Sequence, residues 1–285
     1  MTRHRKQVFL AIFILAVIPI ILFGCGDSNP EPETNDQVLI ETLQQVPLSY
    51  EDVTLWHLGA MRNDPDLNEV YKKWKDWSHR GYLEESYGVK IDDIEYLADA
   101  GLLCIARGDF DIDTIRDHLS PDFHRDDSYT EMEVWMTEPS QDPTSQTGGI
   151  ILGEGLFVRG ANIGDVKAYI KITQGQGFSM YDRNAADVVE RLPDGIVTRI
   201  WRDRLFEGLI VAGRSFEKEG EYLSKMTDIY QFMSAEDADN AGDYFDLMEK
   251  GLARFGTVTL DRDGEFVRLS LTAADHHLMY NLFPN

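Results

Sequence analysis

The spacing of apolar residues along the chain changes from segment to segment and predicts where its helices and strands lie. Apolar residues recur every three or four positions over residues 66–80, which predicts an amphipathic helix with an aromatic stripe in the core. Apolar and polar residues alternate over 53–58, as in a strand. The run over 101–107 is apolar almost throughout and predicts a buried strand.

The remaining segments predict further elements of both types. Helices are expected within 37–50 (ending at Pro47) and over 114–119, 162–173, 185–191, 217–233 and 235–250. Strands are expected over 131–136, 150–152, 156–159, 195–202, 208–212, 257–260 and 266–271, and residues 91–97 fit a weak strand or a short helix. Strands joined by hairpins and mixed with helices favour an α+β fold, with antiparallel sheets and helices packed on one face.

One internal sequence similarity suggests two related units. The segment GLLCIARGDF from Gly101 is similar to GLIVAGRSF from Gly208 when one residue is skipped, and each reads as a strand, a turn and a helix. We therefore expect a first α+β unit over 37–190 and a second over 191–285.

The amino-terminal segment has the three parts of a secretion signal. Arg3, Arg5 and Lys6 form a positive start, and sixteen uncharged residues follow over 8–23. A helix of that length spans roughly 24 Å, less than the ~30 Å hydrocarbon core of a membrane. A polar run rich in Pro, Glu and Asn follows over 26–36. This order predicts export from the cytoplasm.

Leu22, Gly24 and Cys25 at the end of the apolar stretch resemble the lipobox of bacterial lipoproteins, although Phe23 stands where that family prefers a smaller residue. The resemblance implies cleavage between Gly24 and Cys25 and attachment of acyl chains, such as palmitate, at Cys25. It also implies a signal peptide over 1–24, a lipidated cysteine with a tether over 25–36, and a place on the cell membrane facing outside the cytoplasm. Several acyl chains would hold the protein firmly to the membrane. The alternative is an uncleaved signal anchor with the same topology.

The charge balance argues against some partners. The chain has 27 Lys and Arg against 50 Asp and Glu, and without the three basic residues of the signal the net charge falls from −23 to −26. So acidic a chain does not suit nucleic acid, whose binding depends on cationic contacts with phosphates. It equally disfavours adsorption to anionic lipid, so the membrane contact is expected through the lipid anchor alone.

Candidate sites within the mature chain are weak. Asp109, Asp111 and Asp113 alternate as calcium ligands do, but the loop lacks the glycine and glutamate of an EF-hand, and capping of the next helix is the simpler interpretation. Cys104 lies in an apolar run and, with Cys25 lipidated, has no disulfide partner.

Other short patterns indicate no chemistry. Adjacent residues on a strand point to opposite faces, so His276 and His277 do not form a convergent zinc site. The two Gly-x-Gly turns, at 153–155 and 175–177, lack the rest of a phosphate-binding loop, and no serine nucleophile motif occurs. We expect no cofactor.

These observations favour a lipid-anchored extracytoplasmic protein that is a non-enzymatic binding or accessory module, with a protein or small-molecule partner that the sequence does not name. Two alternatives remain open. One is an extracytoplasmic hydrolase that uses a carboxylate pair, and the other is the solute-binding subunit of a transporter, which requires two doubly wound α/β lobes around a cleft.

Overall fold

The structure is a computed structural model of the chain, and it describes residues 34–77, 81–119, 122–129, 132–137, 148–202, 206–221 and 223–274. These residues form one compact unit. None of the helices within the described ranges is both long and apolar enough to cross a membrane.

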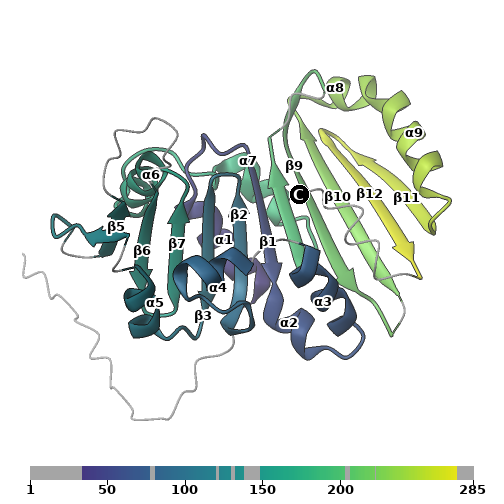
Figure 1. Cartoon of the computed structure of the whole chain (residues 1–285). Helices are drawn as coiled ribbons and strands as arrows, with labels where there is room; N and C mark the ends of the chain where they lie inside the picture. The colour runs from purple at the N-terminus through teal and green to yellow at the C-terminus, as the bar shows by residue number, and fades with distance from the viewer. Residues whose placement is uncertain are drawn as a thin grey trace, which may run out of the picture. The chain divides into compact units, whose positions relative to one another are not determined.

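Helices and strands alternate irregularly along this unit (Figure 1). The helices are α1 (Asn35–Gln45), α2 (Leu58–Asn63), α3 (Asn68–Trp77), α4 (Gly81–Tyr87), α5 (Ile112–Leu119), α6 (Ile163–Thr173), α7 (Arg183–Val189), α8 (Ala235–Asn240) and α9 (Gly242–Leu252), with a short 3-10 turn at Ile91–Asp93. The strands are β1 (Asp52–His57), β2 (Ile94–Ala100), β3 (Leu103–Gly108), β4 (Phe123–Arg125), β5 (Glu133–Thr137), β6 (Gly149–Gly153), β7 (Leu156–Gly160), β8 (Val197–Trp201), β9 (Leu209–Lys218), β10 (Ser224–Phe232), β11 (Thr257–Asp263) and β12 (Phe266–Ala273).

The twelve strands of the described residues belong to one sheet in which every neighbouring pair is antiparallel. The strand order is β11-β12-β10-β9-β8-β1-β2-β3-β7-β6-β5-β4. The pairing of β1 with β8 joins the part of the sheet built before residue 190 to the part built after it, with Thr54 opposite Arg199. The expected α+β class with antiparallel strands is therefore confirmed, as a single continuous sheet.

The strand order is the same in the two parts of the sheet. The first half-sheet runs outward from the centre as β1-β2-β3-β7-β6, and the second runs outward as β8-β9-β10-β12-β11. In each half, three consecutive strands form a meander, and a hairpin follows later in the chain. The second strand of that hairpin, β7 or β12, pairs with the third strand of the meander, β3 or β10. The first half-sheet continues beyond β6 with β5 and β4, whereas β11 is the last described strand of the second.

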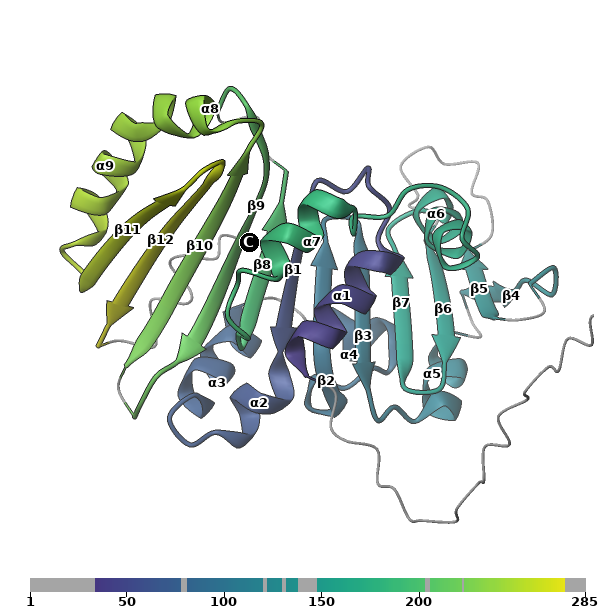
Figure 2. The same cartoon turned by 180° about the vertical axis from the view of Figure 1, so that it is seen from behind.

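Helices cover both faces of the first half-sheet, so the expectation of helices on one face is wrong there. Helices α2 to α5 pack on one face around Leu97 and Phe157, and we call this the front face (Figure 1). Helices α1, α6 and α7 pack on the back face around Leu55 and Ile105 (Figure 2). The reason is visible in β3, whose first four residues are all buried, because a strand with apolar side chains on both sides needs a cover on both sides.

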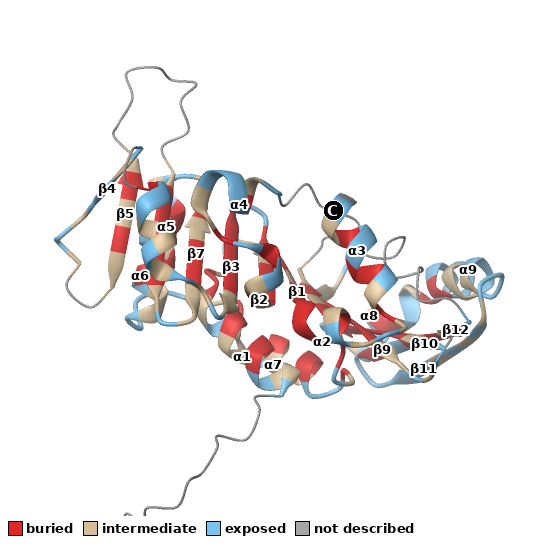
Figure 3. Ribbon diagram, turned by 60° about the horizontal axis from the view of Figure 1, so that its bottom comes forward, coloured by how far each residue is buried: buried red, intermediate tan, exposed pale blue. Residues whose placement is uncertain are grey.

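The second half-sheet is covered less completely. Helices α8 and α9 pack on its front face around Phe245 and Tyr230. On its back face α7 contacts β9 and β10, and no described helix lies over β11 and β12 (Figure 2). Burial falls accordingly toward β11, where exposed residues predominate (Figure 3).

Most of the predicted elements are present, but the helix expected over 217–233 is wrong. The chain there ends β9, turns at Gly220 and forms β10. Strand β10 pairs with β9 on one side and β12 on the other, and nearly all of its residues are buried. A strand that is buried on both faces shows no alternation of apolar and polar residues, and its two pairings outweigh local helix propensity.

Candidate functional site

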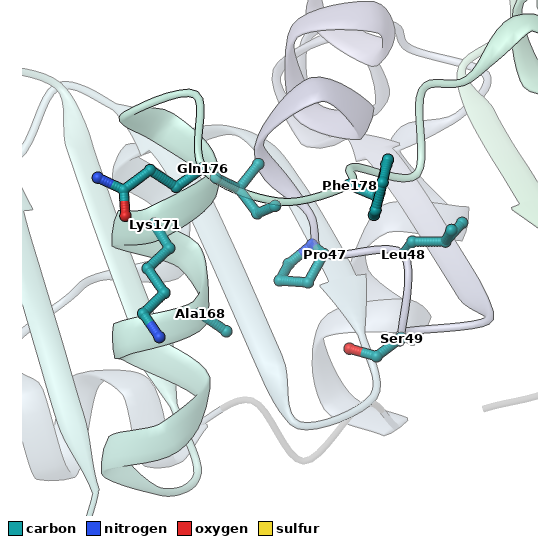
Figure 4. A pocket seen from close by; sticks show the side chains of 8 residues that line it. Pro47, Leu48, Ser49, Ala168, Lys171, Gln176 and Phe178 are labelled. Carbon is teal, nitrogen blue, oxygen red and sulfur yellow. The ribbon is translucent and has the colours of Figure 1, made fainter.

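Within the described residues, one candidate for a binding site is an apolar hollow of about 450 Å³ on the back of the first half-sheet. Three short segments line it, and their side chains are Pro47, Leu48, Ser49, Ala168, Lys171, Ile172, Gln176 and Phe178. Figure 4 shows α6 on one side, Leu48 and Phe178 on the other, and Pro47 between them. The volume lies within the range of small-molecule and side-chain binding clefts.

The turn that follows α6 positions Phe178 at the rim. Gly175 and Gly177 have φ angles of 74° and 105°, in the left-handed region that favours glycine. The amide of Gln176 donates to the carbonyl of Lys171 at 2.7 Å and ends the helix. The chain then leaves the turn extended, and 82 % of Phe178 is exposed, more than for any other large apolar residue of the described part.

Backbone hydrogen bonds hold the segment after this turn against the segment that follows α1. The amide of Leu48 donates to the carbonyl of Phe178 at 2.9 Å, and the amide of Met180 donates to the carbonyl of Val46 at 2.8 Å. These bonds flank a single β-bridge between Pro47 and Ser179. The exposed ring of Phe178 therefore projects from a fixed backbone.

Two side-chain contacts fix α6 to the chain around α1. The hydroxyl of Tyr50 donates to Asp165, and burial together with this carboxylate raises the pKa of Tyr50. The hydroxyl of Tyr169 donates to Gln45 at 3.0 Å, and burial raises the pKa of Tyr169 to about 12. Both tyrosines therefore remain neutral hydrogen-bond donors near neutral pH.

The chemistry of the hollow is that of a binding site. Five of its eight side chains are apolar, and Lys171 is its one charged group. Lys171 is exposed and forms no ion pair with a described residue. An uncompensated ammonium beside apolar carbons suits an apolar group that carries or adjoins negative charge.

A second group of polar side chains lies at the end of β1. Nε2 of His57 lies 3.1 Å from Oε1 of Glu95, and Nη2 of Arg62 lies 3.5 Å from Oε2 of the same carboxylate. Gly59 makes room for this carboxylate, because a β-carbon there would lie 1.9 Å from Oε2 of Glu95. Nδ1 of His57 is buried and has no hydrogen-bond partner in the described part, so neither ring nitrogen is available to a substrate. We interpret this group as structural.

A third group is a buried ion pair in the second half-sheet. Arg214 donates from Nε to Oδ1 of Asp228 at 2.6 Å and from Nη2 to Oδ2 at 2.7 Å. Asp228 is fully buried and also accepts from the hydroxyl of Tyr230 at 3.1 Å. Burial lowers the pKa of Arg214, but the Asp228 carboxylate outweighs it and the net pKa is raised. The pair is a charged element of the core and has no open side facing a hollow in the described part.

The aspartates expected to cap a helix or bind calcium do not converge. Asp111 accepts from the amide of Thr114 at 3.2 Å and from its hydroxyl at 2.7 Å, so it caps α5, and these bonds lower the pKa of Asp111. Asp113 pairs with Arg116 at 2.7 Å, and the amide of Asp109 donates to the carbonyl of Asp93. No group of three or more possible metal ligands occurs within the described ranges.

The other residues singled out from the sequence have no role in the hollow. Cys104 is a buried free thiol in β3. Gly24, Cys25, His276 and His277 lie outside the described residues.

The residues of the hollow were missed from the sequence. The Gly-x-Gly pattern at 175–177 does not match a phosphate loop, but its two glycines are a signal for a turn. Nothing in the sequence indicates that the ring of Phe178 after this turn is exposed. Pro47 and Leu48 gave no signal, because only folding brings them within hydrogen-bonding reach of Phe178.

Comparison with protein-family models, curated proteins and solved structures finds no match for this chain.

Proposed function

We propose that the protein is a lipid-anchored, extracytoplasmic, non-enzymatic binding module that uses the hollow between α1 and α6 to hold an apolar group of its partner. The observation that carries the proposal is Phe178, whose ring is 82 % exposed beside an apolar hollow of about 450 Å³. Solvent-exposed aromatic side chains on a fixed backbone are typical anchors of protein recognition.

The amino-terminal sequence supports the anchoring part of the proposal. Leu22, Gly24 and Cys25 form a lipobox-like ending to the apolar stretch. Cys25 and Thr34, the first described residue, are nine positions apart. At up to ~3.5 Å per residue this tether keeps the start of α1 within about 30 Å of the lipid. The body would therefore work close to the membrane surface.

The two alternatives fit the geometry less well. A carboxylate-pair hydrolase needs two acids facing each other across a cleft, whereas the lining of the hollow contains no carboxylate. A solute-binding subunit needs two doubly wound α/β lobes, whereas the described strands form one antiparallel sheet.

We also propose that the two half-sheets are related units. Support comes from their shared strand order, in which β1, β2, β3, β7 and β6 correspond to β8, β9, β10, β12 and β11. The antiparallel β1–β8 pair at the centre is compatible with a half-turn between the units. In this correspondence β3 matches β10, so the sequence similarity between the segments from Gly101 and Gly208 pairs strands that are not equivalent. Superposition of the five strand pairs in an experimental structure tests the relation, which fails if the rotation is far from a half-turn.

Intact mass spectrometry of protein extracted from its own membranes tests the anchor. We expect a chain that begins at Cys25 and carries the added mass of acyl groups, and a Cys25→Ala variant that is no longer processed in this way. A chain that still begins at Met1 would instead identify an uncleaved signal anchor.

Site-specific photo-crosslinking in native membranes tests the hollow. A benzophenone amino acid at position 178 should give a defined crosslinked product that Leu48→Asp abolishes, because a carboxylate would disrupt the apolar contact. The control places the same amino acid at Leu247, which is 67 % exposed on α9 in the other half. Equal products from both positions, or none from position 178, would contradict the proposal.

A further inference from the structure

We propose that the outer edge of β11 binds an extended basic segment of a partner protein by adding it to the sheet as a further strand. This surface lies at the border of the second half-sheet and is independent of the hollow between α1 and α6.

Strand β11 is the outermost described strand on this side of the sheet, and no described strand pairs with its outer backbone edge. It pairs with β12 over all seven of its residues, and no other described strand lies beside it (Figure 1). An open edge of this length presents a row of amide and carbonyl groups that a second extended chain can pair with.

In the first half-sheet, the strand at the corresponding position has a further strand on its outer edge. Its strand β6 holds the position that β11 holds in the second half, and β5 pairs with the outer edge of β6 through Val134 opposite Ile151. The chain between β10 and β11 is described throughout and contains only α8 and α9. Among the described residues of the second half, none forms a strand at the position that β5 fills in the first.

The side chains of β11 indicate which residues an added strand would need. Val258 and Leu260 are half-buried on the front face, whereas Asp261 and Asp263 are exposed on the back face. Neither aspartate forms an ion pair with a described residue, and Arg262, on the front, lies 3.7 Å from Asp246 of α9. An added strand would meet apolar positions on one face and carboxylates on the other, which calls for alternating aliphatic and basic residues.

The charge of the chain argues against a second copy as the occupant. The full chain carries a net charge of −23, so two copies repel each other. Each copy would also bring its own Asp261 and Asp263 to the same edge. Acidic residues on an open edge disfavour pairing between copies and leave the edge open to a cationic strand.

Binding of short peptides to the full-length protein in detergent tests the proposal. The probe is a capped, fluorescent seven-residue peptide in which lysine and valine alternate, and its binding is followed by fluorescence polarisation. A peptide with glutamate in place of lysine has the same pattern and the opposite charge. A third peptide carries the lysine–valine sequence with an N-methyl group on every amide, which removes all of its backbone hydrogen-bond donors.

A charge swap on β11 gives the decisive variant. We expect the double variant Asp261→Lys with Asp263→Lys to lower the affinity for the lysine–valine peptide about tenfold. The same variant should bind the glutamate–valine peptide. The matched control, Glu85→Lys with Glu154→Lys, changes the net charge equally at exposed positions of the first half. It should leave both affinities within about twofold. Phe178→Ala should leave them unchanged, so that this test does not depend on the hollow.

Three results would overturn the proposal. If the lysine–valine peptide does not bind at about 1 mM, the edge accepts no such strand. If the N-methylated peptide binds equally well, or the control variant weakens binding as much as the charge swap, the attraction is one of net charge and involves no strand addition. If sedimentation shows a dimer that the charge swap changes, the occupant is a second copy.

Discussion

The two half-sheets share a strand order and differ in how completely they are covered. In the first half, helices lie on both faces, β5 covers the outer edge of β6, and the first four residues of β3 and of β6 are buried. In the second half, the back face beyond α7 carries no described helix, and no residue of β11 is buried. The same strand order therefore occurs once with helices on both faces of the sheet and once with part of the back face without a described helix.

The difference changes what the core is made of. Two large apolar clusters on opposite faces of the sheet hold the first half and continue into the second, through Phe216 on the front face and Ile229 on the back face. The cluster under α8 and α9 contains six buried residues, and the strands beside it bury polar side chains as well: Ser215, Thr227, Asp228 and Gln231. Buried polar groups stabilise only when their partners are in place, so we expect the second half to be more sensitive to the loss of single polar contacts.

The largest effect is expected from Asp228→Ala. It leaves the largely buried guanidinium of Arg214 without the carboxylate to which it donates two hydrogen bonds. Loss of one partner of a buried ion pair destabilises by about 3–5 kcal/mol, measured by urea unfolding. The double variant Arg214→Met with Asp228→Leu should recover most of this loss, because it removes both charges. If the single variant loses less than about 1 kcal/mol, the second half does not depend on this pair.

A smaller effect is expected from Gly213→Ala, where α7 covers the back of β9. A β-carbon at this position would lie 2.6 Å from a methyl group of Leu192 and 2.7 Å from one of Val188, so the side chains that cover β9 have to move. We expect a loss of about 1–3 kcal/mol in the free energy of unfolding. Gly251→Ala is the matched control on α9, because nothing lies within 4 Å of its added β-carbon. It should raise stability by up to about 1 kcal/mol. Equal losses from both variants would show that close packing under α7 is not the cause.

The smallest effect is a pH dependence at the end of β1. Burial lowers the pKa of His57, and the Glu95 carboxylate opposes this only in part. The folded protein therefore binds the proton less readily than the unfolded chain, so stability is retained above pH about 6.5 and lost as the pH falls below it. His57→Gln should flatten this slope when unfolding is measured between pH 5 and 8. A slope that is unchanged in the variant would assign the dependence to other groups. β8, which holds the place of β1 in the strand order of the second half, ends at Trp201 and contains no histidine.

The sequence predicted the isolated elements better than the site. The helix over 162–173 and the hairpin of β11 and β12 were recognisable because their signals are local: a regular apolar spacing in one and an Asp-Gly turn in the other. The candidate site was not recognisable, because Leu48 and Phe178 are 130 positions apart and meet only through backbone pairing. No spacing rule connects such residues in a single sequence.

By itself, the sequence determined the α+β class, the antiparallel hairpins and the lipobox-like ending at Cys25, because each depends on neighbouring residues. Only the tertiary structure decided that β1 pairs with β8 to join two halves into one sheet, and that residues 224–232 form a strand. It also decided which surfaces stay open, the hollow beside Phe178 and the edge of β11. The physical reason is that strand pairing and burial depend on what the rest of the chain places alongside a segment, and local spacing carries no record of that.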